Sequence, residues 1–523
     1  MMGLRWLDSV IISAYLIAVL LIGLRFARRQ TTIETYFVAK RSIPSWALGI
    51  SMLATIISAV TFIAYPGAGY AGNWSLLVPG IMVVVVPAIV GFVVIPFYRQ
   101  AVGISTYEYF EKRFGYPARI YGSLSFALGT FSKMAFVVYL LALTIASMTS
   151  LSVSLVIVAV AALTVVYTLI GGLEAVIWAD VVQGIILWGG VLGCLGYLLW
   201  HQPGGPSAAW HVAQLNHKFD MGSTSLVFSK PTIVVLSIYG FFWYLQKYTA
   251  DQTMVQRYLA AKSDKAALKG VFLGAALCIP VWTFFMLLGT QLWAFYKLSG
   301  EQLPTYIAKG DQVFPYFIRT HIPPGIAGLF IAALFGAAMA TLSSDLNCLA
   351  LVAVEDFYRK LYPHAADQRR LRVAKYFVAG CGLLTAAFAI RLSHSLETAL
   401  SLWYTISAIV AGGLAGLFLL AFLSDRANRY GCYVGIFASV VFTSWATLTL
   451  NGGKIIDLGQ YNFPLHDYTI AAIGHVVLLS VGYFASFLFR NPDPSLEALT
   501  LWSWRRRSDP LNHLSLAQYG EKT

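Results

Sequence analysis

Residues 53–69 read LATIISAVTFIAYPGAG, an apolar segment that carries three hydroxyl side chains and is interrupted by Pro66 and Gly67. An interrupted helix leaves backbone carbonyl groups without helical partners. Inside a bilayer such groups are tolerated only where they line a cavity or hold an ion. The segment therefore predicts one half of a cation and substrate site.

The composition of the 523-residue chain is that of a polytopic membrane protein. Hydrophobic residues make up 58% and charged residues 11%, against roughly 25% charged residues in soluble domains. The first apolar run, 6–24, is followed by Arg25, Arg28 and Arg29 and lacks a small-residue cleavage motif, so we expect it to remain as a helix. The five cysteines are isolated from one another along the chain, which disfavours a disulfide framework. Their spacing gives no indication for or against a metal site.

Thirteen apolar runs are long enough to cross a hydrocarbon core of about 30 Å. The predicted spans are 6–25, 44–65, 75–98, 118–147, 151–171, 173–200, 231–250, 270–298, 324–358, 372–392, 396–423, 428–450 and 468–489. An odd number of spans places the two termini on opposite sides of the membrane.

The basic residues predict the orientation, because Lys and Arg near span ends are retained in the cytoplasm. With the N-terminus outside, most of the 36 Lys and Arg residues fall in the inner loops. We therefore expect a multi-pass protein of the cell inner (plasma) membrane with a cytoplasmic C-terminus. The net charge of +13 is then explained by basic residues that set the membrane orientation and contact anionic lipid headgroups. No nucleic-acid partner is implied.

Spans two to six and seven to eleven form two sets of five in opposite orientation. Each set opens with a helix that polar residues interrupt, at 54–61 and at 237–252. Paired interrupted helices in two inverted halves indicate a binding site near the bilayer midplane. The long outer loops, about 201–230 and 299–323, are expected to cap an outer vestibule.

Five sequence blocks occur in order along the chain: YFVAKRS at 36–42, ISTYEYFEKRF at 104–114, YTLIGGLEAVIWADVVQ at 167–183, DQTMVQRYLA at 251–260 and GIAGLFIAALFGAAMATLSSDLN at 325–347. On these blocks the chain resembles a bacterial member of the sodium/solute symporter family, which holds carriers of sugars, sialic acid, proline, pantothenate, iodide and monocarboxylates. The resemblance bears on the fold and on sodium coupling, and it does not name the substrate.

The resemblance implies an all-α polytopic membrane protein of about 13 transmembrane helices with a five-plus-five inverted-repeat (LeuT-like) core. The expected parts are an extra N-terminal helix with an inner loop (1–43), the ten-helix transport core (44–423), two additional helices (424–490) and a cytoplasmic tail (491–523). The tail turns basic at 505–507 and is expected to be flexible or amphipathic. We expect the functional unit to be monomeric.

On the family pattern, one sodium ion lies between the carbonyls of Ala54 and Ile57 on one side and the Ala337 carbonyl and Thr341 hydroxyl on the other. The family usually supplies adjacent hydroxyls at 340 and 341, whereas this chain has Ala340. We expect the ion to bind more weakly or to recruit water. The alternative for Thr341 is a hydroxyl bonded to its own helix.

The resemblance also implies a possible second sodium site at Asp180, Ser343 and Ser344. An ionisable group within a span costs roughly 2.5–3.5 kcal/mol on insertion scales, and a bound cation would remove that cost. The alternative is that Asp180 is a neutralised or hydrogen-bonded anchor for its helix.

Several residues match substrate-contacting positions of the family. Ser58 and Thr61 are two of these, and Lys133 matches an arginine that sialic acid carriers use for a carboxylate, although Lys offers a point charge and not a bidentate fork. Alternatively, Lys133 snorkels or pairs with a carboxylate such as Asp251. Sugar carriers place Glu and Gln where this chain has Val60 and Thr61, which disfavours a neutral sugar.

Tyr248 and Asp251 would line the other half of the substrate site, or else lock their helix. Phe62, Tyr65 and Phe242 are candidate gates over a central ligand. Other aromatic side chains are expected in belts at the lipid interfaces.

These features together predict a sodium-coupled symporter that works by alternating access. The solute is expected to be a small organic anion such as a sialic acid or monocarboxylate, and the alternatives are a neutral sugar or polyol and then an amino acid. The implied partners are the solute, the bilayer and co-transported sodium, although coupling to protons through Asp180 stays open. A nutrient sensor or a membrane enzyme is less favoured, since the nine histidines are scattered.

Overall fold

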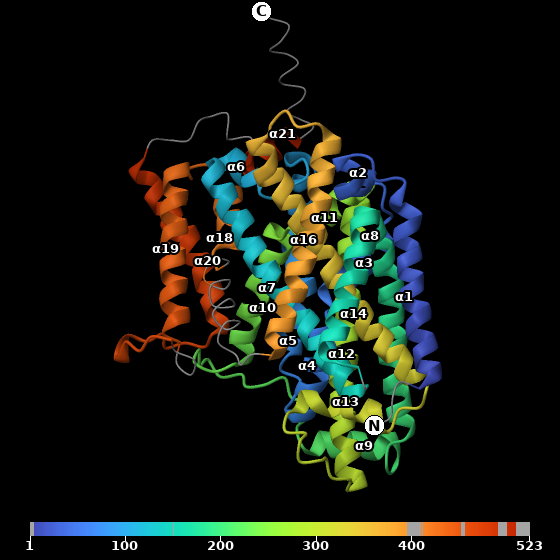
Figure 1. Ribbon diagram of the computed structural model, residues 1–523. Helices are drawn as coiled ribbons and strands as arrows, with labels where there is room; N and C mark the ends of the chain where they lie inside the picture. Colours follow the sequence, from blue (N-terminus) through green and yellow to red (C-terminus); the bar gives the residue numbers. More distant parts are fainter. Residues whose placement is uncertain are drawn as a thin grey trace, which may run out of the picture.

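The computed structural model describes residues 5–149, 151–394, 409, 412–450, 455–489 and 499–508. Figure 1 shows long helices that run side by side and form one bundle. The β-pairing found among the described residues is a single bridge between Ile43 and Ala261. The expected all-helical class is confirmed.

The helices follow one another along the whole described chain. In order they are α1 Trp6–Ala27, α2 Ile33–Val38, α3 Ser45–Ile56, α4 Ala59–Ala71, α5 Leu77–Ala101, α6 Glu108–Phe114, α7 Tyr116–Met148, α8 Val153–Trp200, α9 Gly205–Leu215, α10 Ile233–Ala250, α11 Gln252–Ala260, α12 Asp264–Ser299, α13 Gly310–Thr320, α14 Ile326–Val352, α15 Arg359–Leu361, α16 Asp367–His394, α18 Leu414–Leu423, α19 Arg429–Leu448, α20 Tyr468–Ala485 and α21 Leu501–Ser508. A π-helical turn, Ala353–Tyr358 (η2), joins α14 to α15.

Within the described residues, nine helices are long and apolar enough to cross a membrane, or ten if the bent pair α3 and α4 forms one span. This number is lower than the thirteen spans that the sequence predicts, and the physical reason differs from span to span. Helix α8 has 48 residues and would reach about 72 Å at 1.5 Å per residue, so it holds two spans. Helix α10 is less apolar because it carries Gln246 and Lys247, and the predicted span 396–423 lies partly outside the described residues.

Helix α8 divides where the sequence indicated a boundary between two spans. Gly172 has φ 57° and ψ −160°, outside the helical region. A residue with a Cβ atom is strained at this positive φ. A methyl group there would also lie 2.8 Å from the carbonyl oxygen of Tyr36. Glycine is therefore required at this position.

The first interrupted helix breaks within the predicted segment 54–61. Helices α3 and α4 meet at an angle of 63°, and Ile57 and Ser58 between them are extended. The expected interruption at Pro66 and Gly67 is wrong, because both residues lie inside α4. Ser58 and Thr61 form a capping box that begins α4, whereas proline is tolerated inside membrane helices where its surroundings satisfy the freed carbonyl.

The second interrupted helix breaks at Asp251, between α10 and α11. Asp251 is extended, with φ −94° and ψ 121°, and its side chain accepts a hydrogen bond of 2.8 Å from the amide of Thr253. Aspartate is a preferred N-cap because its carboxylate satisfies a free amide at the start of a helix. The predicted interruption within 237–252 is confirmed.

Helix α14 forms the centre of the bundle. It is buried along 89% of its most apolar window, and it packs against α8, α7, α1 and α3. Glycines let other helices approach closely. A methyl group on Gly289 of α12 would lie 2.0 Å from the carbonyl oxygen of Pro66, and one on Gly69 would lie 2.5 Å from that of Met286. The bent segment α3–α4 is therefore held tightly against α12.

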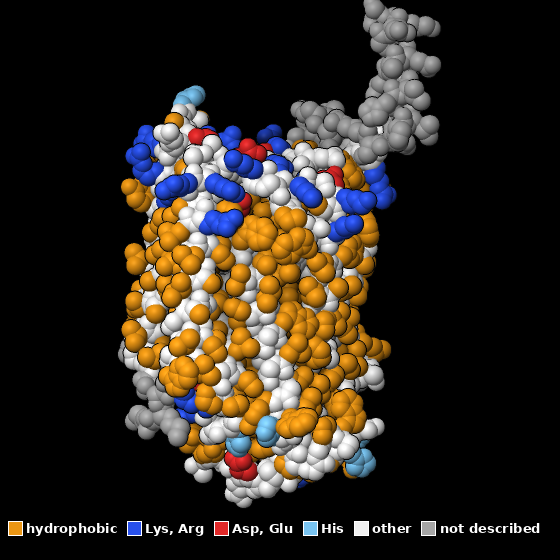
Figure 2. Space-filling view, turned by 90° about the vertical axis from the view of Figure 1, so that its right-hand side faces the viewer, with side chains coloured by type: hydrophobic (Ala, Val, Ile, Leu, Met, Phe, Trp, Pro, Cys, Tyr) orange, Lys and Arg blue, Asp and Glu red, His pale blue; other side chains and the backbone are white. Residues whose placement is uncertain are grey.

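The surface divides into an apolar band and two unequal ends. Figure 2 shows hydrophobic side chains around the middle and Lys and Arg gathered at one end, here called the basic end. Helices α2, α6 and α21 lie at the basic end, whereas α9 and α13 lie at the opposite end, where α1 begins (Figure 1). This distribution is typical of a membrane protein with one cytoplasmic face.

Replacing Gly289 by Ala should lower the melting temperature of the purified protein in detergent. The added methyl group overlaps the Pro66 carbonyl, and overpacking of this kind costs about 1–3 kcal/mol. Gly129→Ala is the matched control, since its new Cβ meets no described atom within 4 Å. Equal melting temperatures for the two variants would contradict the close packing of α4 on α12.

Candidate ion and substrate site

The break between α3 and α4 leaves backbone carbonyls without helical partners. The amide of Ser58, which would continue the helix onto Ala54, instead lies 3.4 Å from the Thr61 hydroxyl. The amide of Thr61 donates to the Ser58 carbonyl at 3.0 Å and not to that of Ile57. The two carbonyls that the family pattern assigns to sodium are therefore among those that the break sets free.

Helix α14 runs past this break. It packs against both α3 and α4, and the hydroxyls of Thr55 and Ser344 lie 3.3 Å apart. Thr341 is buried in the protein interior. Its hydroxyl donates to the Ala337 carbonyl at 3.1 Å, so the two oxygens expected to face one ion are neighbours. The back-bonded state expected as the alternative is present, and the hydroxyl oxygen still has lone pairs for a cation.

Asp180 forms a fully buried ion pair that the sequence analysis missed. Its Oδ2 atom lies 3.0 Å from Nη2 of Arg257 and accepts a hydrogen bond of 2.6 Å from Ser51. The same guanidinium donates to Ser344 at 2.7 Å. Ser343 instead donates to the Ala340 carbonyl at 3.2 Å. Arg257 thus supplies the positive charge that Asp180 needs, which favours the anchor interpretation.

A second ion pair joins α7 to α14. The ammonium of Lys133 lies 2.9 Å from the carboxylate of Asp345. Asp345 is fully buried, whereas 37% of the Lys133 side chain is exposed. The alternative that Lys133 pairs with a carboxylate is therefore present, but the carboxylate is Asp345 and not Asp251, which pairs with Lys247 at 2.7 Å. Asp345 follows Ser344 directly in the LSSDLN block, a signal that was present in the sequence.

Tyr248 and Asp251 are held by the protein itself. The Tyr248 hydroxyl donates to the Val83 carbonyl at 3.2 Å, and Asp251 bonds to Lys247 and to the Thr253 amide. These contacts favour the helix-locking interpretation of both residues. Ser58 and Thr61 form the capping box of α4, so they lie beside the freed carbonyls.

The candidate gates fall into separate aromatic groups. Phe62 is fully buried, and its ring centre lies 4.6 Å from that of Phe285 and 5.5 Å from that of Phe330. Tyr65 stacks on a tryptophan of α12, at 6.1 Å. Phe242 lies beside His475 of α20, at 5.8 Å. Phe62 therefore joins α4 to α12 and α14, while Phe242 faces an added helix.

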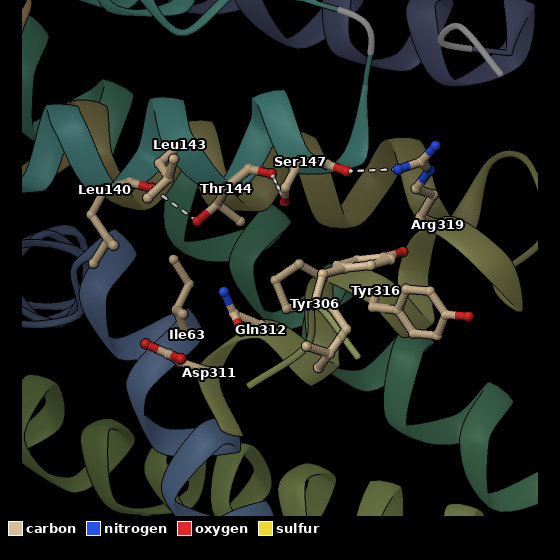
Figure 3. A pocket seen from close by; sticks show the side chains of 12 residues that line it. Ile63, Leu140, Leu143, Thr144, Ser147, Tyr306, Asp311, Gln312, Tyr316 and Arg319 are labelled. Carbon is tan, nitrogen blue, oxygen red and sulfur yellow. Dashed lines mark hydrogen bonds between the residues drawn. The ribbon is translucent and has the colours of Figure 1, made fainter. Parts of the chain in front are cut away.

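A cavity of about 220 Å³ lies between α4, α7 and α13 (Figure 3). Its lining residues are Ile63, Leu140, Leu143, Thr144, Ser147, Tyr306, Ile307, Asp311, Gln312, Pro315, Tyr316 and Arg319. Helix α13, from the predicted capping loop, packs so closely on α4 that a methyl group on Gly310 would lie 2.6 Å from the Gly67 carbonyl. In Figure 3, Asp311 and Arg319 point from opposite ends of the cavity.

The end of α4 is fixed by a lysine from the neighbouring loop. The Lys218 ammonium donates to the Tyr70 carbonyl at 2.7 Å and lies 5.0 Å from the ring centre of Trp293. Burial lowers the pKa of Lys218 to about 8. The last turn of α4 is therefore tied to a loop at the end that carries α13.

Residues 36–438 match the sequence model of the Sodium:solute symporter family. The chain belongs to this family. Its members are transporters and not enzymes, so the expectation that the protein is no enzyme is confirmed. The break at residues 57 and 58, with α14 beside it, thus lies within the matched region of a sodium-coupled solute symporter.

Curated members of the family cover nearly the whole chain. The sodium/sialic acid symporters of Aliivibrio fischeri and Proteus mirabilis are 31% and 32% identical to it, over 93% and 92% of this chain and 94% and 95% of their own lengths. The human sodium-coupled monocarboxylate transporter 1 is 27% identical over 88% of this chain and 76% of its own.

Solved structures agree with the fold. The substrate-bound, outward-open structure of a sodium-coupled sialic acid symporter matches with a TM-score of 0.86 and 30% identity, over 94% of this chain and 99% of that chain. A nucleobase-cation-symport-1 family transporter matches with a TM-score of 0.54 and 14% identity, over 89% and 97% of the two chains. The predicted LeuT-like fold is confirmed.

Arg257→Met should strongly destabilise the protein, because it leaves the Asp180 carboxylate buried without a positive partner. Breaking a buried pair in this way costs about 3–5 kcal/mol. The double variant Arg257→Met, Asp180→Asn removes both charges and should recover much of the lost melting temperature and folded yield in detergent. Arg369→Met, at an exposed arginine, is the control. A double variant no more stable than the single one would contradict the pair.

Proposed function

We propose that this symporter imports a small organic anion, such as a sialic acid or a monocarboxylate, together with sodium. The observation that carries the proposal is the partly exposed side chain of Lys133, which pairs with Asp345 on α14. Asp345 directly follows Ser344, whose hydroxyl lies 3.3 Å from that of Thr55 near the end of α3. A partly exposed lysine offers a point charge that a solute carboxylate can meet. The related sialic acid and monocarboxylate symporters carry solutes of this class.

We assign one sodium ion to the carbonyls of Ala54, Ile57 and Ala337 and the hydroxyl of Thr341. Sodium is a hard cation that takes oxygen ligands, and carbonyls at helix breaks supply them in transporters of this kind. The missing hydroxyl at Ala340 leaves room for water as a further ligand. We propose one ion and not two, since the carboxylate that a second ion would use is already paired with Arg257.

A neutral sugar or polyol is the second candidate solute. It is supported by the contact between Lys133 and Asp345, which already neutralises the ammonium. A solute without charge would then bind through hydroxyl groups and leave that pair intact. The two candidates differ in whether binding depends on the positive charge of Lys133.

The transport cycle that we propose follows from the two ends of the bundle. The basic end faces the cytoplasm by the positive-inside rule, which puts the N-terminus outside and the cavity under α13 on the entry side. Sodium binding at the α3–α4 break favours the form open to the outside, and solute binding closes it. Entry of one charge releases about 2.3 kcal/mol per 100 mV, and we propose that one chain performs the whole cycle in the plasma membrane.

Thr341→Ala should abolish sodium-dependent uptake, because it removes the side-chain ligand of the proposed ion. Sodium should also fail to raise the melting temperature of the purified variant, whereas the wild-type response should fit one site. Thr164→Ala is the matched control, since Thr164 is equally buried and bonded to its own helix, at 2.8 Å to Val160. An unchanged sodium affinity in Thr341→Ala would refute the assignment.

Lys133→Met should abolish the binding of an organic anion. A thermal-shift screen of the wild type in sodium, with N-acetylneuraminate, lactate, galactose, mannitol and proline, identifies the class. Lys133→Arg should keep the response to an anion because it keeps the charge, and Asp345→Asn should keep it because it leaves the ammonium in place. If galactose or mannitol stabilises the wild type and Lys133→Met alike, the neutral-solute alternative holds.

A further inference from the structure

The cavity between α4, α7 and α13 lies on the same face of α7 as Lys133. Leu140 and Ser147 line it, and they follow Lys133 by seven and fourteen residues, a spacing that keeps side chains on nearly one face of a helix. At 1.5 Å per residue these steps are about 10 and 21 Å along α7. The cavity is therefore separate from Lys133 and lies in line with it, at the end of the bundle that carries α13.

The cavity is open to the outside and carries charges of opposite sign along its length. Arg319 and Tyr306 line it and are exposed, Tyr306 to 66%. Asp311 lies eight residues before Arg319 on α13, about 12 Å along the helix. In Figure 3, Arg319 lies beside Ser147 of α7, and Asp311 lies beside Ile63 of α4. Arg319 is therefore the outer charge and Asp311 the inner one.

Both charged groups have hydrogen-bonding capacity that the described residues leave unused. Among these residues, Arg319 makes one long hydrogen bond, 3.4 Å to the Ser147 carbonyl, although a guanidinium carries five N–H donors. The Oδ1 atom of Asp311 is buried and has no hydrogen-bond partner in the described part of the chain. Leaving a buried acceptor unpaired costs free energy, so a ligand at either end gains binding energy from these groups.

The inner end of the cavity adjoins the helix that follows the break. Ile63, which lines the cavity, is the fifth residue of α4. A methyl group on Gly67 would lie 2.7 Å from the amide nitrogen of Asp311. The carbonyls that we assign to sodium lie directly before α4, and a carboxylate oxygen is a ligand that hard cations prefer. The inner charge is thus placed for sodium and the outer charge for an anion.

We propose that this cavity is an entry site for both co-transported species, in which Arg319 captures the carboxylate of the solute and Asp311 attracts a sodium ion. The inference rests on the proposed function and adds where each species binds first. Arginine pairs with a carboxylate through parallel N–H bonds, and charges that line a cleft raise association rates by about 10–10³.

The entry site holds the solute only briefly. Its volume is about 220 Å³, below the roughly 300–1,000 Å³ of sites that enclose drug-sized ligands, and Arg319 at its mouth is exposed. The solute then passes along one face of α7 to Lys133, which sets the affinity at equilibrium.

The test is a stopped-flow measurement of the association of N-acetylneuraminate with the purified full chain at saturating sodium. Arg319→Met should lower the association and dissociation rate constants by the same factor, at least tenfold, because an entry site speeds both directions and leaves the equilibrium constant unchanged. Arg319→Lys should keep most of the rate, and Arg319→Glu should be slowest. Lys297→Met removes an exposed cation at the end of α12 and should associate like the wild type.

Asp311→Asn tests the sodium half of the proposal. At limiting sodium this variant should bind N-acetylneuraminate more slowly than the wild type, because it no longer attracts the ion that binding requires. At saturating sodium the two should associate equally fast, because a bound ion then neutralises Asp311 in the wild type. Faster association of the variant at every sodium concentration would mean that Asp311 only repels the anion, and would overturn this assignment.

The remaining outcomes separate the entry site from the proposed function. If the wild type binds N-acetylneuraminate through Lys133, but at rates that no Arg319 variant changes, the entry site is overturned and the proposed function stands. A loss of equilibrium affinity in Arg319→Met at an unchanged association rate also overturns the entry site. If the wild type binds neither N-acetylneuraminate nor lactate, the proposed function fails, and this inference fails with it.

Discussion

Backbone carbonyls that are freed inside a bilayer must find partners, because no water is present in the hydrocarbon to donate hydrogen bonds to them. In this symporter that constraint acts at the break between α3 and α4. The capping box of Ser58 and Thr61 begins a new helix and turns two amides away from the preceding carbonyls. Helix α14 lies beside the break with the hydroxyl of Thr341. The tight packing of α12 on α4, through glycines, holds the broken helix in the bent form that keeps these oxygens available.

Ion pairs inside the bundle solve a second constraint, the cost of burying charge. Three pairs join helices of the core: Asp180–Arg257, Lys133–Asp345 and Lys247–Asp251. In each pair the two charges cancel, so these six charged side chains lie in the core without a large net electrostatic field. The pairs differ in exposure, since both side chains of the first are fully buried whereas 37% of the Lys133 side chain in the second is exposed. In our proposal the first pair fixes helices and the second meets the solute.

The two ends of the molecule serve different roles for reasons of charge and packing. At the basic end, Lys and Arg side chains gather and α21 is docked on the bundle. At the opposite end, α13 packs on α4, and a cavity lies between α4, α7 and α13. The two ends of the bundle therefore differ, since one is rich in cations and the other is covered by a short helix. The direction of transport that we propose is based on this difference.

The sequence by itself determined the membrane class, the spans, the division at Gly172 and the family, because hydropathy and motif blocks are local properties. It also indicated the oxygens of the candidate sodium site through that family. The tertiary structure alone decided that Pro66 and Gly67 stay inside α4, that Arg257 holds Asp180 across 77 residues, and that Lys133 reaches Asp345 across 212. Partners so distant along the chain depend on how helices are rotated against one another, and a linear pattern does not contain that rotation.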